Sequence, residues 1–246
     1  DWRNTPNVVT SVKNQGQCGS CWTFGSTGSL EGAYALMTGN PPSRTAQNAE
    51  FLSPSTGFYG FSEQNFVDCD KYSNGCDGGD VSTAFLYAAQ MGGVPSEKTY
   101  PYVDIGGPSK PPQTCSLTNS QNTLANTNTL PVDPYTKVKP LDIPSLESAL
   151  MRQPISISVQ AGATSAGGPQ PWQTYTGGII TLADGCAQTL DHAVLLVGWH
   201  DDPSNTPGKS YWIIKNSWAD TWGEKGYVYI EKSSLNACGV LSDPSY

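Results

Sequence analysis

An odd number of cysteines is the feature that most constrains how this chain can fold. In an oxidising compartment three disulfides would leave one thiol free, whereas in the cytosol all seven cysteines would be reduced and buried. We favour the oxidised arrangement, in which the one free thiol is a candidate for chemistry. The seven are Cys18, Cys21, Cys69, Cys76, Cys115, Cys186 and Cys238.

Two of these residues, Cys18 and Cys21, form a C-x-x-C pair that allows three interpretations. A zinc site needs a second ligand pair at suitable spacing, and Cys69 and Cys76 are seven residues apart with no histidine nearby. A redox pair needs the strand–turn–helix context of a parallel sheet, which the sequence lacks. The third interpretation makes Cys21 a nucleophile and Cys18 one half of a disulfide.

Hydrophobic periodicity divides the chain into a helical first half and a β-rich second half. The spacing of apolar residues predicts helices at 20–38, 63–68, 81–91 and 146–151. Alternation of apolar and polar residues predicts a strand at 155–159. Further strands are predicted at 193–197, 211–215 and 226–230. We therefore predict an α+β protein of two lobes with a cleft between them.

The composition argues against two classes of partner. The formal net charge is -8 and the isoelectric point is near 4.6, so no nucleic acid is expected, because phosphate binding needs a basic surface. No stretch reaches the roughly 18 apolar residues of a membrane span. The first residues are polar and carry no secretory signal, so the chain is either cytosolic or has lost its targeting segments.

The segment Cys-Gly-Ser-Cys-Trp at 18–22 resembles the local signature of the papain-type cysteine proteases. The resemblance continues in order along nearly the whole chain, and it is nearer to the papain and cathepsin L branch than to cathepsin B. The other matching segments are Asp1-Trp2-Arg3, Ser62-Glu63-Gln64, Asp68-Cys69-Asp70, Gly75-Cys76-Asp77-Gly78-Gly79, Leu190-Asp191-His192-Ala193-Val194, Lys215-Asn216-Ser217-Trp218 and Cys238-Gly239.

This resemblance implies a papain-like fold of two lobes with the active-site cleft between them. Residues 1–115 would form a mainly helical left lobe that carries Cys21. Residues 116–246 would form a β-barrel-like right lobe that carries His192 and Asn216. The chain termini are expected to cross over to the opposite lobe.

The resemblance also assigns the catalytic roles. Cys21 would be the nucleophile, because the N-terminus of the predicted helix and a neighbouring imidazolium both favour a thiolate. His192 would be its proton partner; the plainer alternative is a buried core histidine, and the only other histidine is His200. Asn216 would orient the ring of His192. Gln15 would share the oxyanion with the backbone N–H of Cys21.

Disulfides and a substrate pocket follow from the same resemblance. The implied pairs are Cys18–Cys76, Cys69–Cys115 and Cys186–Cys238, which leave Cys21 free. Asp243 would lie at the floor of the pocket for the residue second before the scissile bond, here called the specificity pocket. This pocket would accept apolar residues and also basic ones, unless Asp243 turns outward into solvent. The implied substrate-binding residues are Gly78, Gly79, Asp80, Val81, Ser158, Leu190, Asp191, Ala193, Trp218 and Asp243.

The resulting hypothesis is a cysteine endopeptidase that uses neither cofactor nor metal. Its expected partners are peptide and protein substrates, a propeptide and cystatin-type inhibitors. We expect a lysosomal, vacuolar or secreted monomer in its mature form, after propeptide removal. Residues 41–59 are an insertion relative to papain and are predicted to be a solvated surface loop. The alternatives are a catalytically inactive homologue that acts by binding, and a zinc or redox protein.

Overall fold

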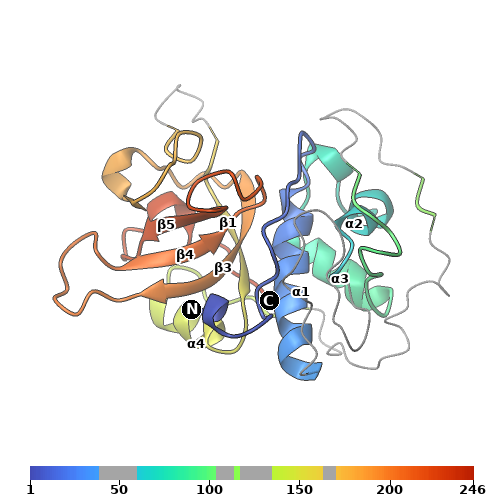
Figure 1. Cartoon of the computed structure of the whole chain (residues 1–246), viewed down its shortest axis with the longest axis horizontal. Helices are drawn as coiled ribbons and strands as arrows, with labels where there is room; N and C mark the ends of the chain where they lie inside the picture. The colour runs from blue at the N-terminus through green and yellow to red at the C-terminus, as the bar shows by residue number, and fades with distance from the viewer. Residues whose placement is uncertain (39–59, 104–113, 117–134, 163–169) are drawn as a thin grey trace.

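A computed structural model describes residues 1–38, 60–103, 114–116, 135–162 and 170–246 of the chain. The described residues form two lobes that lie side by side, one built from helices and one from a sheet with a helix beside it (Figure 1). The α+β class is therefore confirmed. The insertion at 41–59 lies outside the described residues.

Three helices build the first lobe, and each boundary lies within one residue of the prediction. Ser62 Oγ begins the second helix by accepting the N–H of Asn65 at 3.0 Å. Asp80 begins the third by accepting the N–H of Ser82 at 2.7 Å. Such caps satisfy backbone donors that have no partner inside a helix. None of the described helices is long and apolar enough to cross a bilayer. The three are α1 (Cys21–Thr38), α2 (Glu63–Cys69) and α3 (Val81–Gln90).

The second lobe holds α4 (Ile143–Leu150) and a five-stranded sheet in the order β1-β3-β4-β5-β2. The strands pair antiparallel except β2, which runs parallel to β5. β1 and β2 form the two edges, so the sheet is open and not closed into the barrel-like form that the resemblance implies. β2 was not predicted, because two residues are too few to show alternation. The strands are β1 (Ile155–Val159), β2 (Ile179–Ile180), β3 (His192–His200), β4 (Tyr211–Lys215) and β5 (Tyr227–Glu231).

Helix α1 packs against the sheet through a face of glycines. A Cβ added at Gly25 would lie 2.7 Å from Ser156 Oγ, and one at Gly28 would lie 2.8 Å from Leu195 Cδ2. Glycine lowers helix stability by about 1 kcal/mol relative to alanine, so its presence here is explained by the close approach of β1 and β3. Figure 1 shows α1 on the side of its lobe that faces the sheet. This packing fixes the start of α1 relative to the start of β3.

Three disulfides crosslink the described residues, and they are the pairs that the resemblance implies. Cys18 is bonded to Cys76, Cys69 to Cys115 and Cys186 to Cys238. The first joins the loop before α1 to the short turn before α3. The free cysteine is Cys21, which is partly exposed.

The division into residues 1–115 and 116–246 stays a prediction, but the first residues of the chain contact the sheet lobe. Trp2 Nε1 donates to the backbone oxygen of Leu150, at the end of α4, at 2.6 Å. The guanidinium of Arg3 lies 5.0 Å from the ring centre of Tyr227 in β5. The chain therefore touches the sheet lobe before it enters α1.

Candidate active site

Cys21 and His192 meet where α1 packs against β3. Cys21 is the first residue of α1 and His192 is the first residue of β3. Their side chains are hydrogen-bonded to each other, and the backbone N–H groups of Ala193 and Trp22 also bond to the sulfur. Each lobe thus contributes one member of the pair.

The environment of this pair favours its charged form. Burial raises the pKa of the Cys21 thiol, but the hydrogen bond and positive charge of His192 outweigh burial and lower it overall. Burial lowers the pKa of His192, whereas its bonds to Cys21 and Asn216 raise it overall. The free N–H groups of the first turn of α1 favour an anion in the same place. A thiolate held in this way is an activated nucleophile.

Asn216 is hydrogen-bonded to Nε2 of the His192 imidazole. His192 Nε2 lies 2.8 Å from Asn216 Oδ1, and the same oxygen accepts the N–H of Ser217 at 2.8 Å. Because an amide oxygen only accepts, Nε2 is the donor and Nδ1 is left to face Cys21. Asn216 directly follows Lys215, the last residue of β4, and β4 pairs with β3.

Tryptophan rings enclose the imidazole. The ring of Trp218 stacks on His192 with centres 4.9 Å apart. The fully buried Trp172 meets the same imidazole edge-on at 5.9 Å and stacks on Trp222 at 5.9 Å. Rings in these positions keep water from the bond between His192 and Asn216, which strengthens it. Sequence reasoning missed Trp172, because no motif surrounds it.

Gln15 is held firmly in the loop that leads into α1. Its backbone N–H donates to the Ser217 oxygen at 2.9 Å, and its Oε1 accepts from Ser217 Oγ at 2.6 Å. Nε2 donates to the Cys18 oxygen at 2.9 Å. Within the described part of the chain, the second N–H of that amide has no acceptor. The N–H of Cys21 also lacks an acceptor inside the helix, because it opens α1. Sequence reasoning missed the role of Ser217 as the partner of Gln15.

The predicted substrate-binding residues come from both lobes. Val81 and Ala193 are buried in one apolar cluster, against which the Cys21 side chain packs. Gly78 has a φ of 107° with open space at the Cβ position, and a Cβ at Gly79 would lie 2.6 Å from the ring of Trp22. Glycine suits both positions, because a side chain would be strained at the first and would meet the tryptophan ring at the second. Ser158 of β1 pairs with Ala193, whereas Leu190 is exposed.

Asp191 fixes the backbone beside His192. Its carboxylate accepts the N–H of Ala161 at 2.7 Å and the N–H of Gly162 at 3.1 Å. The negative charge of Asp191 also helps to raise the pKa of His192, after the larger contributions of Cys21 and Asn216.

Asp243 is paired with a lysine that the sequence did not point to. Lys137 Nζ lies 2.8 Å from Asp243 Oδ1, with the two side chains 50% and 30% exposed. The bond to Asp243 raises the pKa of Lys137, and the negative charges of Asp243 and Asp80 add to this effect. Lys137 therefore lies near one carboxylate from each lobe. Sequence reasoning missed it, because it stands in no motif.

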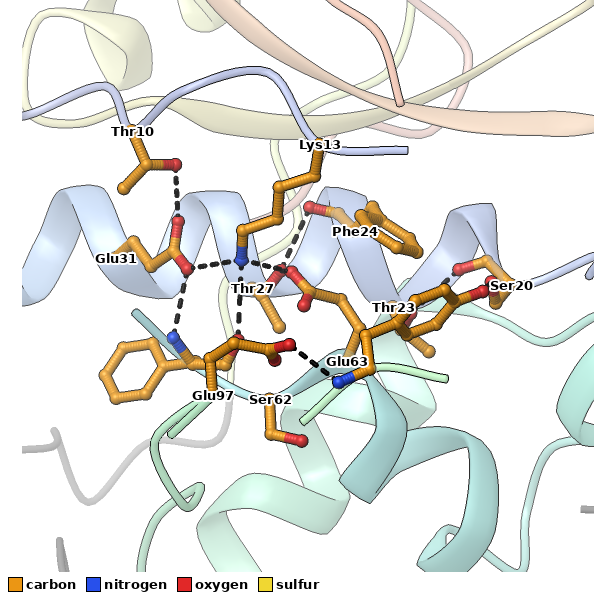
Figure 2. Close-up of polar contacts among 12 residues, drawn as sticks. Thr10, Lys13, Ser20, Thr23, Phe24, Thr27, Glu31, Ser62, Glu63 and Glu97 are labelled. Atoms are coloured by element: carbon orange, nitrogen blue, oxygen red, sulfur yellow. Dashed lines mark hydrogen bonds and ion pairs between the residues drawn. The ribbon is translucent and has the colours of Figure 1, made fainter. Parts of the chain in front are cut away.

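A second set of ionisable side chains is buried between the loop before α1 and helices α1 and α2 (Figure 2). Lys13 Nζ lies 2.9 Å from Glu31 Oε1 and 2.5 Å from Glu63 Oε1. Burial lowers the pKa of Lys13, but the charges of Glu31, Glu63 and Glu97 raise it overall. We call Lys13, Glu31, Glu63 and Glu97 the buried ionic cluster.

Lys215 connects this cluster to the active site. Its Nζ donates to Thr10 Oγ1 at 2.9 Å, and Thr10 donates to Glu31 Oε2 at 2.7 Å. Burial lowers the pKa of Lys215 to about 8. Because Lys215 directly precedes Asn216, these two hydrogen bonds link the cluster to the residue that bonds His192.

The zinc and redox interpretations of the C-x-x-C pair find no support among the described residues. No group of three histidine, cysteine, aspartate or glutamate side chains there could hold a metal ion. Cys18 is bonded to Cys76 and not to Cys21.

Comparison with known proteins gives one consistent answer. The family described as "Papain family cysteine protease" matches residues 1–246. Human "Cathepsin L2" is 37% identical over 253 residues, which cover 100% of this chain and 64% of that protein. A "Cathepsin L-like" protein of Caenorhabditis elegans is 39% identical and covers 100% of this chain and 62% of its own length. The chain spans about half to two thirds of the length of the curated relatives it matches.

Solved structures agree with the sequence comparison. A Carica candamarcensis cysteine protease in complex with E-64 superposes with a TM-score of 0.75 at 33% identity, covering 100% of this chain and 95% of that one. Digestive procathepsin L 3 of Tenebrio molitor gives a TM-score of 0.77 at 35% identity, with coverage of 100% and 68%.

Proposed function

Because the chain belongs to the papain family of cysteine proteases, we propose that it hydrolyses internal peptide bonds with Cys21 as the nucleophile. The observation that carries this proposal is the hydrogen-bonded series Cys21–His192–Asn216 at the start of α1. It couples a thiolate to an imidazolium whose orientation Asn216 would set through its bond to Nε2. This is the arrangement that nucleophilic catalysis at a carbonyl requires.

The geometry supports the following sequence of steps. Cys21 Sγ attacks the scissile carbonyl, and His192 Nδ1 gives its proton to the departing amine as the C–N bond breaks. The acyl group is then bound to Sγ as a thioester. His192 next takes a proton from water, whose oxygen attacks the thioester carbonyl. The acid leaves and the Cys21 thiolate is regenerated with a protonated His192.

Two donors would stabilise the oxyanion that forms in each attack. The second N–H of the Gln15 amide and the backbone N–H of Cys21 are the candidates, since neither has an acceptor within the described residues. Removing one such donor from an oxyanion hole typically lowers kcat by about 10²–10³-fold.

Hydrolysis of a fluorogenic peptide amide by the wild type and by Cys21→Ser tests the proposal. We expect turnover by the wild type and loss of more than 99% of it in a folded serine variant, because serine has no comparable acidity. A serine variant that keeps more than about one per cent of the activity would remove Cys21 from the nucleophilic role.

We further propose that the cuts are internal. Exopeptidases need a group that captures a chain terminus, and cathepsin B-like enzymes use a loop with paired histidines for this. His200 is the only histidine other than His192, and it lies at the opposite end of β3, stacked on Tyr211 at 5.0 Å. Mass spectrometry of a long peptide digest should find internal fragments first; serial release of dipeptides would contradict the proposal.

The specificity pocket is proposed to be apolar with an acidic floor that Lys137 already occupies. Val81 and Ala193 would supply the apolar wall, and Asp243 and Asp80 the negative charge. A basic substrate residue would have to displace Lys137 from Asp243, whereas leucine would not. The pocket therefore accepts Arg or Lys but prefers Leu, Val or Phe. Exposed ion pairs are worth about 0.2–1 kcal/mol, so the displacement weakens basic substrates without excluding them.

We propose that the protein is a monomer. Its expected partners are peptide and protein substrates, a propeptide and cystatin-type inhibitors. The proform of the Tenebrio enzyme supports maturation from a precursor in this chain as well. Three disulfides suit a lysosomal, vacuolar or secreted protein, because such bonds persist in oxidising compartments.

A further inference from the structure

Tyr102 contacts the loop that precedes the nucleophile from the side of the helical lobe. Its ring meets Phe24 of α1 edge-on, with centres 5.0 Å apart. Its backbone N–H donates to Glu97 Oε1 at 2.6 Å. Both the ring and the backbone of Tyr102 are thus held in place, so its hydroxyl has a fixed position.

The hydroxyl of Tyr102 bonds to both ends of the loop at residues 15–20. It donates to the backbone oxygen of Gln15 at 2.7 Å, and it lies 2.8 Å from Ser20 Oγ. A phenol has one proton and a carbonyl can only accept, so the tyrosine proton goes to Gln15 and Ser20 Oγ donates to the tyrosine oxygen. One hydroxyl therefore ties the residue that carries the amide donor to the residue next to Cys21.

Loss of this hydroxyl would leave two buried polar groups without their partner. Ser20 is fully buried and Gln15 is 7% exposed. An unsatisfied buried polar group is costly, so the loop would shift to find water or another partner. The bonds of Gln15 to Ser217 and Cys18 would remain.

We propose that Tyr102 is a positioning residue for the oxyanion hole. This role depends on the proposed peptidase function. Tyr102 holds the loop at 15–20 so that the Gln15 amide and the Cys21 N–H point at one site. It touches no reacting atom. Its effect is confined to steps that create an oxyanion, because the contact between Cys21 and His192 does not pass through it.

Two reactions of the same thiolate separate this role from a general structural one. Acylation by a peptide amide creates an oxyanion. Alkylation by iodoacetamide forms an S–C bond and releases iodide without one. A misplaced oxyanion hole slows the first reaction only, whereas a disturbed thiolate slows both.

The test is Tyr102→Phe, with active enzyme titrated by E-64 so that only folded sites are counted. We expect kcat for a fluorogenic peptide amide to fall about tenfold with KM nearly unchanged. The rate constant for iodoacetamide and its pH profile should stay within about twofold. Tyr100→Phe is the matched control, because its hydroxyl bonds to Asp68 Oδ2 at 2.8 Å and not to the loop; it should leave kcat unchanged.

Two results would overturn the proposal: an unchanged kcat, or alkylation slowed as much as acylation. If Tyr102→Phe fails to fold, Ser20→Ala removes one of the two bonds and should give a smaller loss of kcat with the same normal alkylation. Equal rates for Ser20→Ala and wild type in both reactions would then contradict it. A wild type that is alkylated at Cys21 but cleaves no peptide would instead defeat the proposed function.

Discussion

His192 Nε2 lies 2.8 Å from Asn216 Oδ1. His192 is the first residue of β3, and Asn216 directly follows the last residue of β4. This bond orients the imidazole towards Cys21 and raises the pKa of His192, after the larger effects of Cys21. The peptidase mechanism needs a protonated His192 to release the amine. The bond should therefore set both the rate and the upper pH limit of activity.

Asn216→Ala tests this relation. We expect partial activity, with kcat lowered about 10- to 100-fold, because the proton still passes through His192. The pKa of His192 should fall without its partner, so the alkaline limb of kcat/KM should move to lower pH. A pH–rate profile of each enzyme measures both effects. An unchanged alkaline limb would show that the bond does not control the protonation of His192.

Lys137→Met tests the floor of the specificity pocket. Without the lysine, Asp243 becomes free to pair with a basic substrate residue, so the ratio of kcat/KM for Arg over Leu substrates should rise by up to about fivefold. The matched control is Lys137→Met with Asp243→Asn, which should return the ratio to near the wild-type value. Equal ratios in all three enzymes would place both residues outside the pocket.

Glu97→Gln tests the buried ionic cluster. Burial, followed by repulsion from Glu63, raises the pKa of Glu97 from 4.5 to about 8. The folded state thus binds a proton that the unfolded state releases, so this residue makes stability fall as pH rises from about 4.5 to 8. The variant should lose that slope, which is at most about 1.4 kcal/mol per pH unit for one proton.

Urea unfolding between pH 4.5 and 8 measures this slope. Lys215 does not interfere, because its pKa of about 8 in the folded state keeps it protonated in both states over most of that range. If the free energy of unfolding changed with pH equally in the wild type and in Glu97→Gln, Glu97 would have to be ionised in the folded protein at acidic pH.

Gly28→Ala tests the packing of α1 on the sheet. Alanine is the better helix former, yet its Cβ would lie 2.8 Å from Leu195 Cδ2. We expect a net loss of about 1–3 kcal/mol in the free energy of unfolding. In Leu195→Val the clashing atoms are removed, so the double variant should lose less than the sum of the two single changes. A Gly28→Ala protein more stable than wild type would show that α1 can move away from β3.

Local periodicity was enough to predict most of the fold. The helix at Val81–Gln90 and the strand at Ile155–Val159 have apolar patterns that can be read within one segment. The pairing of cysteines and the meeting of Cys21 with His192 came from the resemblance and not from periodicity. Trp172 and Lys137 were missed, because each matters through contacts with residues far away in sequence. The strand β2, which forms one open edge of the sheet, was missed for another reason: two residues are too few to show a pattern.

Labelling with an E-64-type epoxide tests whether Cys21 is the catalytic thiolate. The thiolate should open the epoxide, forming one S–C bond as a C–O bond breaks. Mass spectrometry should find one label per chain, on the peptide that contains Cys21, and peptidase activity should fall in proportion to labelling. Cys21→Ser should take up none. Full activity in a fully labelled enzyme, or inactivation with the label on another residue, would contradict the account.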